Sequence, residues 1–146
     1  MTLPNEILLP RVAKAVAEGS VVTIPVKGHS MFPFILGNQD CIELHSPTAL
    51  KVGDVVLAEI APKQYILHRI YRFCGEREVV LMGDGNVRQT ERCFIEDIKA
   101  KGTVVISKSG KRKPLDSVTM RFLARLWKIC LPVRSLLLRI LWFIMF

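Results

Sequence analysis

Residues 54–83 read DVVLAEIAPKQYILHRIYRFCGEREVVLMG, and this stretch decides the fold class. Its segments 54–60, 65–73 and 78–83 are of strand length and rich in β-branched and apolar residues. The residues GERE at 75–78 supply a turn between the second segment and the third. Short strands joined by turns, without intervening helical patterns, predict a mainly antiparallel β fold with few helices.

The same pattern continues on both sides of this stretch. Three further strand candidates are SVVTIPV (20–26), DCIELH (40–45) and GTVVIS (102–107). Pro25 indicates an edge strand or a strand end, because proline donates no hydrogen bond to a neighbouring strand. The sequence therefore predicts one compact β domain over residues 20–107.

Helical patterns flank this domain. Apolar residues between Ile7 and Glu18 recur at helical spacing, which predicts a short amphipathic helix within residues 1–19. That segment lacks an apolar run of the length of a signal peptide, so none is expected. Residues 108–117 are predicted to be a basic linker, and 118–146, called the tail below, a basic apolar helix that Pro132 kinks.

Composition limits the classes of protein to consider. The chain has 146 residues, of which half are apolar and 23% are charged, which fits one globular domain and argues against disorder. No two cysteines stand at CxxC spacing, so neither a zinc site nor a redox dithiol is expected, and no metal or cofactor is predicted. Free thiols are expected at Cys41, Cys74, Cys93 and Cys130.

The net charge of +8 lies at one end of the chain. Residues 1–107 carry 12 basic and 12 acidic side chains, whereas residues 108–146 carry nine basic side chains and one acidic side chain. Nucleic-acid-binding domains usually spread basic charge over a folded face. A neutral body with a basic, apolar tail favours a membrane surface as partner, and no nucleic acid is expected.

The tail is too short and too charged to favour a membrane span, because Arg134 and Arg139 interrupt its apolar run. An amphipathic helix in the membrane interface fits better, with basic residues toward the headgroups and Trp127, Trp142 and Phe143 inserted. The alternative is a helix packed on the β body or on a partner subunit. Reduced cysteines and the lack of an export signal favour the cytoplasmic face.

Three residues are candidates for chemistry. Ser30 lies in KGHSMFPFIL (27–36), on a turn where its hydroxyl and its backbone N–H can both face a substrate, but serine needs a base to act as a nucleophile. His68 lies mid-strand among apolar neighbours, and Asp84 follows a strand between two glycines, where a carboxylate could orient an imidazole. Taken singly, each has a purely structural interpretation: a turn serine, a structural histidine and an Asx-turn aspartate.

Together, the segments that hold these residues resemble the sequence boxes of the S24/S26 serine peptidases, the family of type I signal peptidases and LexA-type repressors. The similar segments, in chain order, are GHSMFP (28–33), VGDVVLAE (52–59), ILHRI (66–70) and MGDGN (82–86). The resemblance spans about residues 20–107. It implies a LexA- or signal-peptidase-like body of coiled antiparallel sheets and a serine endopeptidase that cleaves leader- or signal-like peptides.

The resemblance also implies residue roles. Ser30 is the expected nucleophile, and His68 stands where most bacterial members have a lysine base, as in the signal peptidases of the endoplasmic reticulum. An unperturbed histidine, with a pKa of about 6.5, is largely neutral at pH 7 without the burial that a lysine base needs. Asp84 matches the aspartate of the Gly-Asp box. The implied oxyanion- and substrate-binding positions are Gly28, Met31 and Pro33.

The chain departs from the family pattern at several positions. Gly28 stands where signal peptidases often have a serine, so a second oxyanion donor is not assigned. No second aspartate follows Asp84 closely, and Glu91 is the nearest acid. The competing interpretation is a non-catalytic relative that binds an extended peptide by adding it as a strand. The sequence does not define the oligomeric state.

Overall fold

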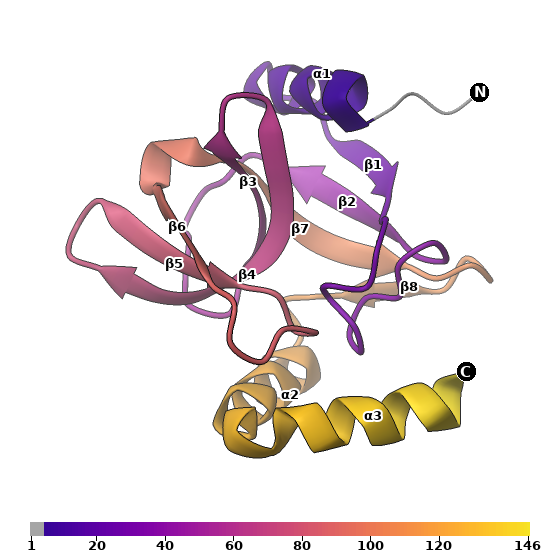
Figure 1. The fold of residues 1–146 in the computed structure, drawn as a ribbon. Coiled ribbons are helices and arrows are strands. Elements are labelled where there is room, and N and C mark those ends of the chain that lie inside the picture. Colours follow the sequence, from indigo (N-terminus) through magenta and orange to yellow (C-terminus); the bar gives the residue numbers. More distant parts are fainter. Residues whose placement is uncertain (1–4) are drawn as a thin grey trace.

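The computed structural model describes residues 5–146, with side chains described from Ile7 onward. Eight strands form one sheet, with a helix at one end of the body and two helices at the other (Figure 1). The helices are α1 (Asn5–Ala17), α2 (Val118–Ile129) and α3 (Arg134–Met145), and short 3-10 turns are η1 (Ile95–Asp97) and η2 (Leu131–Val133). The strands are β1 (Val22–Pro25), β2 (Cys41–His45), β3 (Val55–Ala61), β4 (Gln64–Cys74), β5 (Glu78–Met82), β6 (Glu91–Phe94), β7 (Ile98–Ile106) and β8 (Arg112–Pro114).

Every strand pairing in the sheet is antiparallel, so the predicted mainly antiparallel β class is confirmed. The strand order is β1-β2-β7-β3-β4-β5-β6, and β8 pairs with β7. The C-terminal half of β7 pairs with β2 and β8, whereas its N-terminal half pairs with β3. Strand β7 therefore joins the two halves of the sheet.

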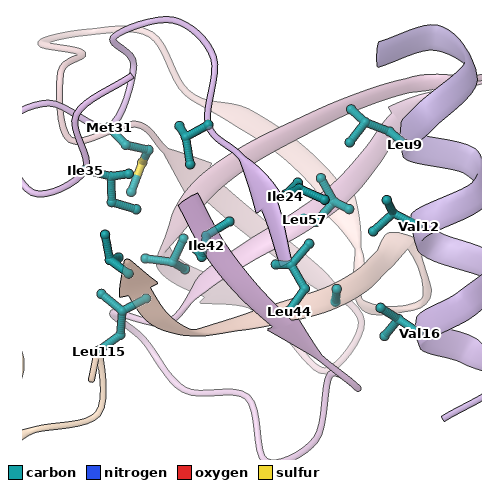
Figure 2. Packing of buried hydrophobic residues seen from close by; sticks show 14 residues of the cluster. Leu9, Val12, Val16, Ile24, Met31, Ile35, Ile42, Leu44, Leu57 and Leu115 are labelled. Atoms are coloured by element: carbon teal, nitrogen blue, oxygen red, sulfur yellow. The ribbon is translucent and has the colours of Figure 1, made fainter. Parts of the chain in front are cut away.

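The body has two apolar clusters. The first lies between α1 and the strands β1, β2, β3 and β7 (Figure 2). From α1, the residues Leu9, Val12 and Val16 face this cluster at the spacing of one helical face, and each buried side chain contributes about 1.5–3 kcal/mol. The second cluster lies among β3–β6 and β7. The helix predicted within residues 1–19 is confirmed for the described part, and residues 1–4 lie outside it.

Two strands were not predicted. Strand β6 contains a single buried apolar residue, Cys93, and β8 has three exposed residues. Neither strand carries the alternating apolar pattern that marks a strand in sequence. Both form because a neighbouring strand offers a free edge, so part of the expected linker 108–117 is sheet: Arg112 pairs with Ile106.

The tail is two helices rather than one. Helix α2 begins after Ser117, whose hydroxyl accepts a hydrogen bond from the Met120 N–H at 3.2 Å, and the break falls at η2, which contains Pro132. The predicted kink is thus confirmed. Among the described residues, no helix is both long enough and apolar enough to cross a membrane.

The orientation of α2 differs from the expectation. Trp127 is only 8% exposed and contacts the body, so it is not free to insert into a membrane. Arg121 forms an ion pair with the buried Asp54, and Lys128 donates a hydrogen bond to the Tyr71 carbonyl at 2.6 Å. The expectation that these basic residues point toward lipid headgroups was therefore wrong, because buried acceptors in the body attract them.

Candidate active site

Ser30 lies in the loop between β1 and β2. Two bonds close the loop at its base: Val26 N–H donates to the Asp40 carbonyl at 2.9 Å, and the Asp40 carboxylate accepts from Leu36 N–H at 2.8 Å. Met31 and Ile35 anchor the loop, because their side chains are buried in the first cluster. The loop is therefore fixed to the core on both sides of a half-buried serine.

His68 lies on β4 and is 7% exposed. Its Nδ1 is 2.6 Å from Oε1 of Glu91, the first residue of β6. A carboxylate only accepts hydrogen bonds, so Nδ1 carries the proton of this bond. In the neutral ring, Nε2 is then the acceptor, which is the tautomer that a general base needs.

Two glycines bring the serine loop against this imidazole. Gly85 N–H donates to the Ser30 carbonyl at 2.8 Å. A Cβ at Gly83 would lie 2.4 Å from the same carbonyl oxygen and 3.1 Å from the Nε2 of His68. Both glycines of the Gly-Asp-Gly turn are therefore needed for a close approach of the backbone, and Nε2 is directed toward the Ser30 loop.

Ser30 and His68 line one cavity of about 190 Å³. Its walls come from β1, from the first half of β4 and from α1, including Ile24, Tyr65 and Leu9. Lys27 also lines it and is the second basic side chain at this site. The cavity is smaller than typical small-molecule sites, and its position beside an edge strand suits a few residues of an extended chain.

Asp84 contacts Arg69 and Trp127 instead of His68. Its carboxylate accepts two hydrogen bonds from Arg69, from Nε at 2.9 Å and from a terminal nitrogen at 2.7 Å, and its backbone carbonyl accepts from the Trp127 indole at 2.8 Å. Successive side chains of a strand point to opposite faces, so Arg69 and His68 diverge. The orienting contact expected of Asp84 is thus made by Glu91.

Sequence reasoning noted Glu91 only as the nearest acid. The register explains its place: Ile70 pairs with Leu81 and Leu81 pairs with Glu91, which puts Glu91 on the sheet face that His68 shares with Ile70. Recognising this contact requires knowledge of β6, the strand that the pattern did not reveal.

The other expected positions lie in the serine loop. The Met31 side chain belongs to the core and lines the Ser30 cavity. Gly28 has a φ of 75°. Its carbonyl packs so closely on Gly37 that a Cβ on Gly37 would overlap the carbonyl oxygen of Gly28. Pro33 is half-buried in the same loop, and neither it nor Gly28 is among the described residues that line the cavity.

Other chemistries have little support in this part of the chain. Within residues 5–146 no group of three or more histidine, cysteine or acidic side chains is placed to hold a metal ion. The four cysteines are free thiols, and Cys93 is buried. Burial, with a smaller contribution from Asp97, raises the pKa of the Cys93 thiol to about 11, so it is a poor nucleophile at neutral pH.

The described arrangement is a serine on an anchored turn that lines one cavity with an imidazole, and the Nδ1 of that imidazole is bonded to a carboxylate. These are the parts that general-base activation of a hydroxyl requires. No protein-family model matches the chain, and no curated protein matches it.

Proposed function

We propose that this protein is a serine endopeptidase of the S24/S26 type, with Ser30 as nucleophile and His68 as general base. The observation that carries the proposal is the shared cavity of Ser30 and His68, with the imidazole bonded through Nδ1 to Glu91. The four sequence segments that resemble the family support the same assignment, and the antiparallel β body is compatible with its LexA-like fold.

The proposed reaction begins when the Ser30 Oγ attacks a peptide carbonyl. As the new C–O bond forms, the hydroxyl proton passes to Nε2 of His68, and Glu91 stabilises the resulting imidazolium. The imidazolium then gives this proton to the leaving amine, the C–N bond breaks, and an acyl-enzyme remains. Water, deprotonated by the same imidazole, hydrolyses the ester and regenerates Ser30. The Ser30 N–H is the proposed oxyanion donor.

The proposed substrate is a leader- or signal-like peptide bound in extended form. The cavity lies against β1, which ends the strand order and pairs only with β2 among the described strands. A free strand edge can accept a peptide as an added strand, which places its carbonyls at a fixed distance from the edge. Ser30 follows β1 closely in the chain, so a peptide along this edge passes the nucleophile.

We further propose that the protein works at a membrane surface, on its cytoplasmic face, through the outer side of the tail. Although α2 docks on the body, several apolar side chains of the tail remain exposed, among them Phe122, Ile129, Phe143 and Ile144. An exposed apolar surface of this kind, beside basic residues, is typical of proteins that bind membrane interfaces or other proteins.

The free edge of β1 also supports a second candidate, a non-catalytic protein that binds an extended peptide without cleaving it. The two candidates differ in whether the Ser30 hydroxyl is activated. They are therefore separated by a chemical test of that hydroxyl, without knowledge of the natural substrate.

The test is covalent labelling by an acylating serine probe, read as intact mass between pH 5 and pH 9. We expect a single adduct on the full-length protein, with loss of at least about 10³-fold in labelling rate for Ser30→Ala and for His68→Gln. Labelling should be suppressed at acid pH, where imidazoles are protonated and accept no proton. Lys27→Gln is the matched control, because Lys27 lines the same cavity.

Three results would contradict the peptidase proposal or its assignment of residues. Labelling that survives Ser30→Ala would move the nucleophile elsewhere, and labelling that is lost in Lys27→Gln but kept in His68→Gln would give the base role to the lysine. A folded protein that binds peptides but shows no Ser30 adduct at any pH would favour the non-catalytic candidate. Circular dichroism of each variant establishes that it is folded.

A further inference from the structure

A second and larger cavity, of about 610 Å³, lies between α2 and the body. It is lined by residues of β4, by the turn at 51–53 and by one side of α2, and it contains Arg69 rather than His68. Its volume falls within the range of sites that hold small organic ligands. The proposed peptidase does not use this cavity.

The charged side chains that line this cavity are predominantly basic: six are basic and two are acidic. Arg69 is paired with Asp84, and Arg121 is paired with Asp116 and Asp54. Within the described part of the chain, the remaining basic side chains have no carboxylate within ion-pair distance. These are Lys51, Arg125, Lys128 and Arg134.

Arg134 is the member of this group that most needs an anion. It is only 3% exposed, and its two terminal nitrogens donate to the Asn86 and Trp127 carbonyls at 3.0 Å each. Its Nε is buried without a hydrogen-bond partner in the described structure. A buried cation with neutral acceptors and an unused donor is costly, and burial lowers the pKa of Arg134, although the Asp84 carboxylate partly offsets this effect.

We propose that this cavity binds the phosphoryl group of a phosphate ester. One carboxylate carries too little charge for four basic side chains, whereas a phosphate monoester carries up to two negative charges and three strong acceptor oxygens. Arginine side chains suit such groups because their planar donors match two oxygens at once. Trp127 and Ala124 also line the cavity and offer an apolar wall to the remainder of the ester.

The phosphoryl group has two possible carriers, a phospholipid headgroup and a soluble phosphate ester, and the experiment includes both. The protein has two tryptophans, so in a Trp142→Phe background the intrinsic fluorescence reports Trp127, which lines the cavity. The probes are inorganic phosphate, glycerol 3-phosphate and phosphatidylcholine vesicles that contain phosphatidic acid, whose headgroup is a phosphate monoester. Sodium chloride at matched ionic strength is the reference for the soluble probes, and pure phosphatidylcholine vesicles are the reference for the lipid probe.

We expect saturable fluorescence changes with at least one phosphate probe and none with sodium chloride. Arg125→Gln removes an exposed cavity arginine and should weaken binding about five- to tenfold. Arg139→Gln removes a charge from α3 outside this cavity and should leave binding unchanged. Saturation by glycerol 3-phosphate assigns a soluble ester, whereas saturation only by the vesicles that contain phosphatidic acid, and not by pure phosphatidylcholine vesicles, assigns a lipid headgroup.

Arg134→Gln is the second test, applied after circular dichroism shows that the variant is folded, and it should weaken binding more than Arg125→Gln. If Arg134→Gln does not fold, the comparison of Arg125→Gln with Arg139→Gln still decides. Equal weakening by those two variants would overturn the proposal, because binding would then depend on overall positive charge and not on this cavity. The absence of a saturable signal with every phosphate probe would also overturn it.

Discussion

His68 and Arg69 are neighbours on β4 that serve opposite faces of the sheet. His68 bonds to Glu91 and faces the serine loop, whereas Arg69 bonds to Asp84 and faces α2. The Gly-Asp-Gly turn serves both sides: its glycines let the serine loop approach, and its aspartate holds the arginine. In the proposed enzyme, Glu91 is therefore the positioning residue for the imidazole.

This division leads to a prediction for Glu91→Gln. An amide can bond the imidazole through its nitrogen and so select the wrong tautomer, and it stabilises the imidazolium less than a carboxylate. We expect the rate of Ser30 labelling to fall about 10²- to 10⁴-fold, as for comparable triad acids. Glu91→Asp should recover part of the rate, because it keeps the carboxylate.

The matched control for this change is Glu96→Gln, an exposed glutamate in η1 that pairs with Arg77. It should label at the normal rate. A normal labelling rate and an unchanged pH profile in folded Glu91→Gln would show that the His68–Glu91 bond is structural only.

For the candidate site, the sequence predicted individual residues but not the residues that they contact. Ser30 and His68 could be proposed because the segments that hold them together resemble the S24/S26 sequence boxes, although each residue taken singly has a structural interpretation. Their shared cavity follows from strand pairing over long distances, which local patterns do not contain. Glu91 was missed because β6 lacks the apolar alternation that indicates a strand in a sequence.

Among the elements, α2 packs on the body, which is the alternative that the sequence left open to the favoured position in a membrane interface. Asp54 is buried and accepts from Lys51 N–H at 2.8 Å, while Arg121 and Lys101 supply its ion pairs. A buried carboxylate without such partners is strongly unfavourable, so Asp54 holds the basic side of α2 against the body. The sequence could predict the helix and its two faces, but not which face is covered.

Trp127 allows this docking to be measured. Trp127→Phe keeps an aromatic ring but leaves the buried Asp84 carbonyl without its donor, which should lower the free energy of unfolding by about 1–3 kcal/mol. Trp127→Ala should cost about 3–5 kcal/mol, because it also opens a cavity. Urea unfolding followed by far-UV circular dichroism measures both changes.

Phe122→Ala is the control within the same helix. Phe122 is 63% exposed, and its removal should change the free energy of unfolding by less than about 0.5 kcal/mol. Equal small effects of Trp127→Ala and Phe122→Ala would mean that α2 is not docked on the body in solution.

The molecule as a whole consists of a neutral body and a basic, apolar tail, and the proposed membrane attachment depends on this division. The side chains that remain exposed on the tail are predominantly apolar, because several basic ones are turned toward the body. Attachment should then depend more on apolar contact than on charge, and vesicle binding should survive salt that releases proteins from nucleic acid.

The test is partition onto neutral phosphatidylcholine vesicles at two salt concentrations, with duplex DNA as the comparison. Phe143→Ser should weaken partition about tenfold, since a fully inserted phenylalanine contributes about 1.5–3 kcal/mol. Phe94→Ser, on the exposed side of β6, should have no effect. Binding to DNA alone, or equal losses in both variants, would contradict attachment through the tail.

The fold class and most strands of the body followed from the sequence, because antiparallel strands with a covered face carry apolar alternation and turn residues. The order of strands did not. Besides its neighbour β8, strand β7 pairs with β2 and β3, which lie much earlier in the chain, and no local pattern encodes these two distant pairings.

This placement of β7 has a consequence for the order of events on the ribosome. Ile42 in β2 pairs with Val105 in β7 and cannot do so before β7 has been synthesised. The first half of the sheet is therefore incomplete until almost all of the body has been made. Ser30 is synthesised long before β7, whereas Glu91 is synthesised only shortly before it. A nascent chain thus has the serine long before it has a working arrangement around it, and the proposed protease would remain latent until its own synthesis is nearly complete.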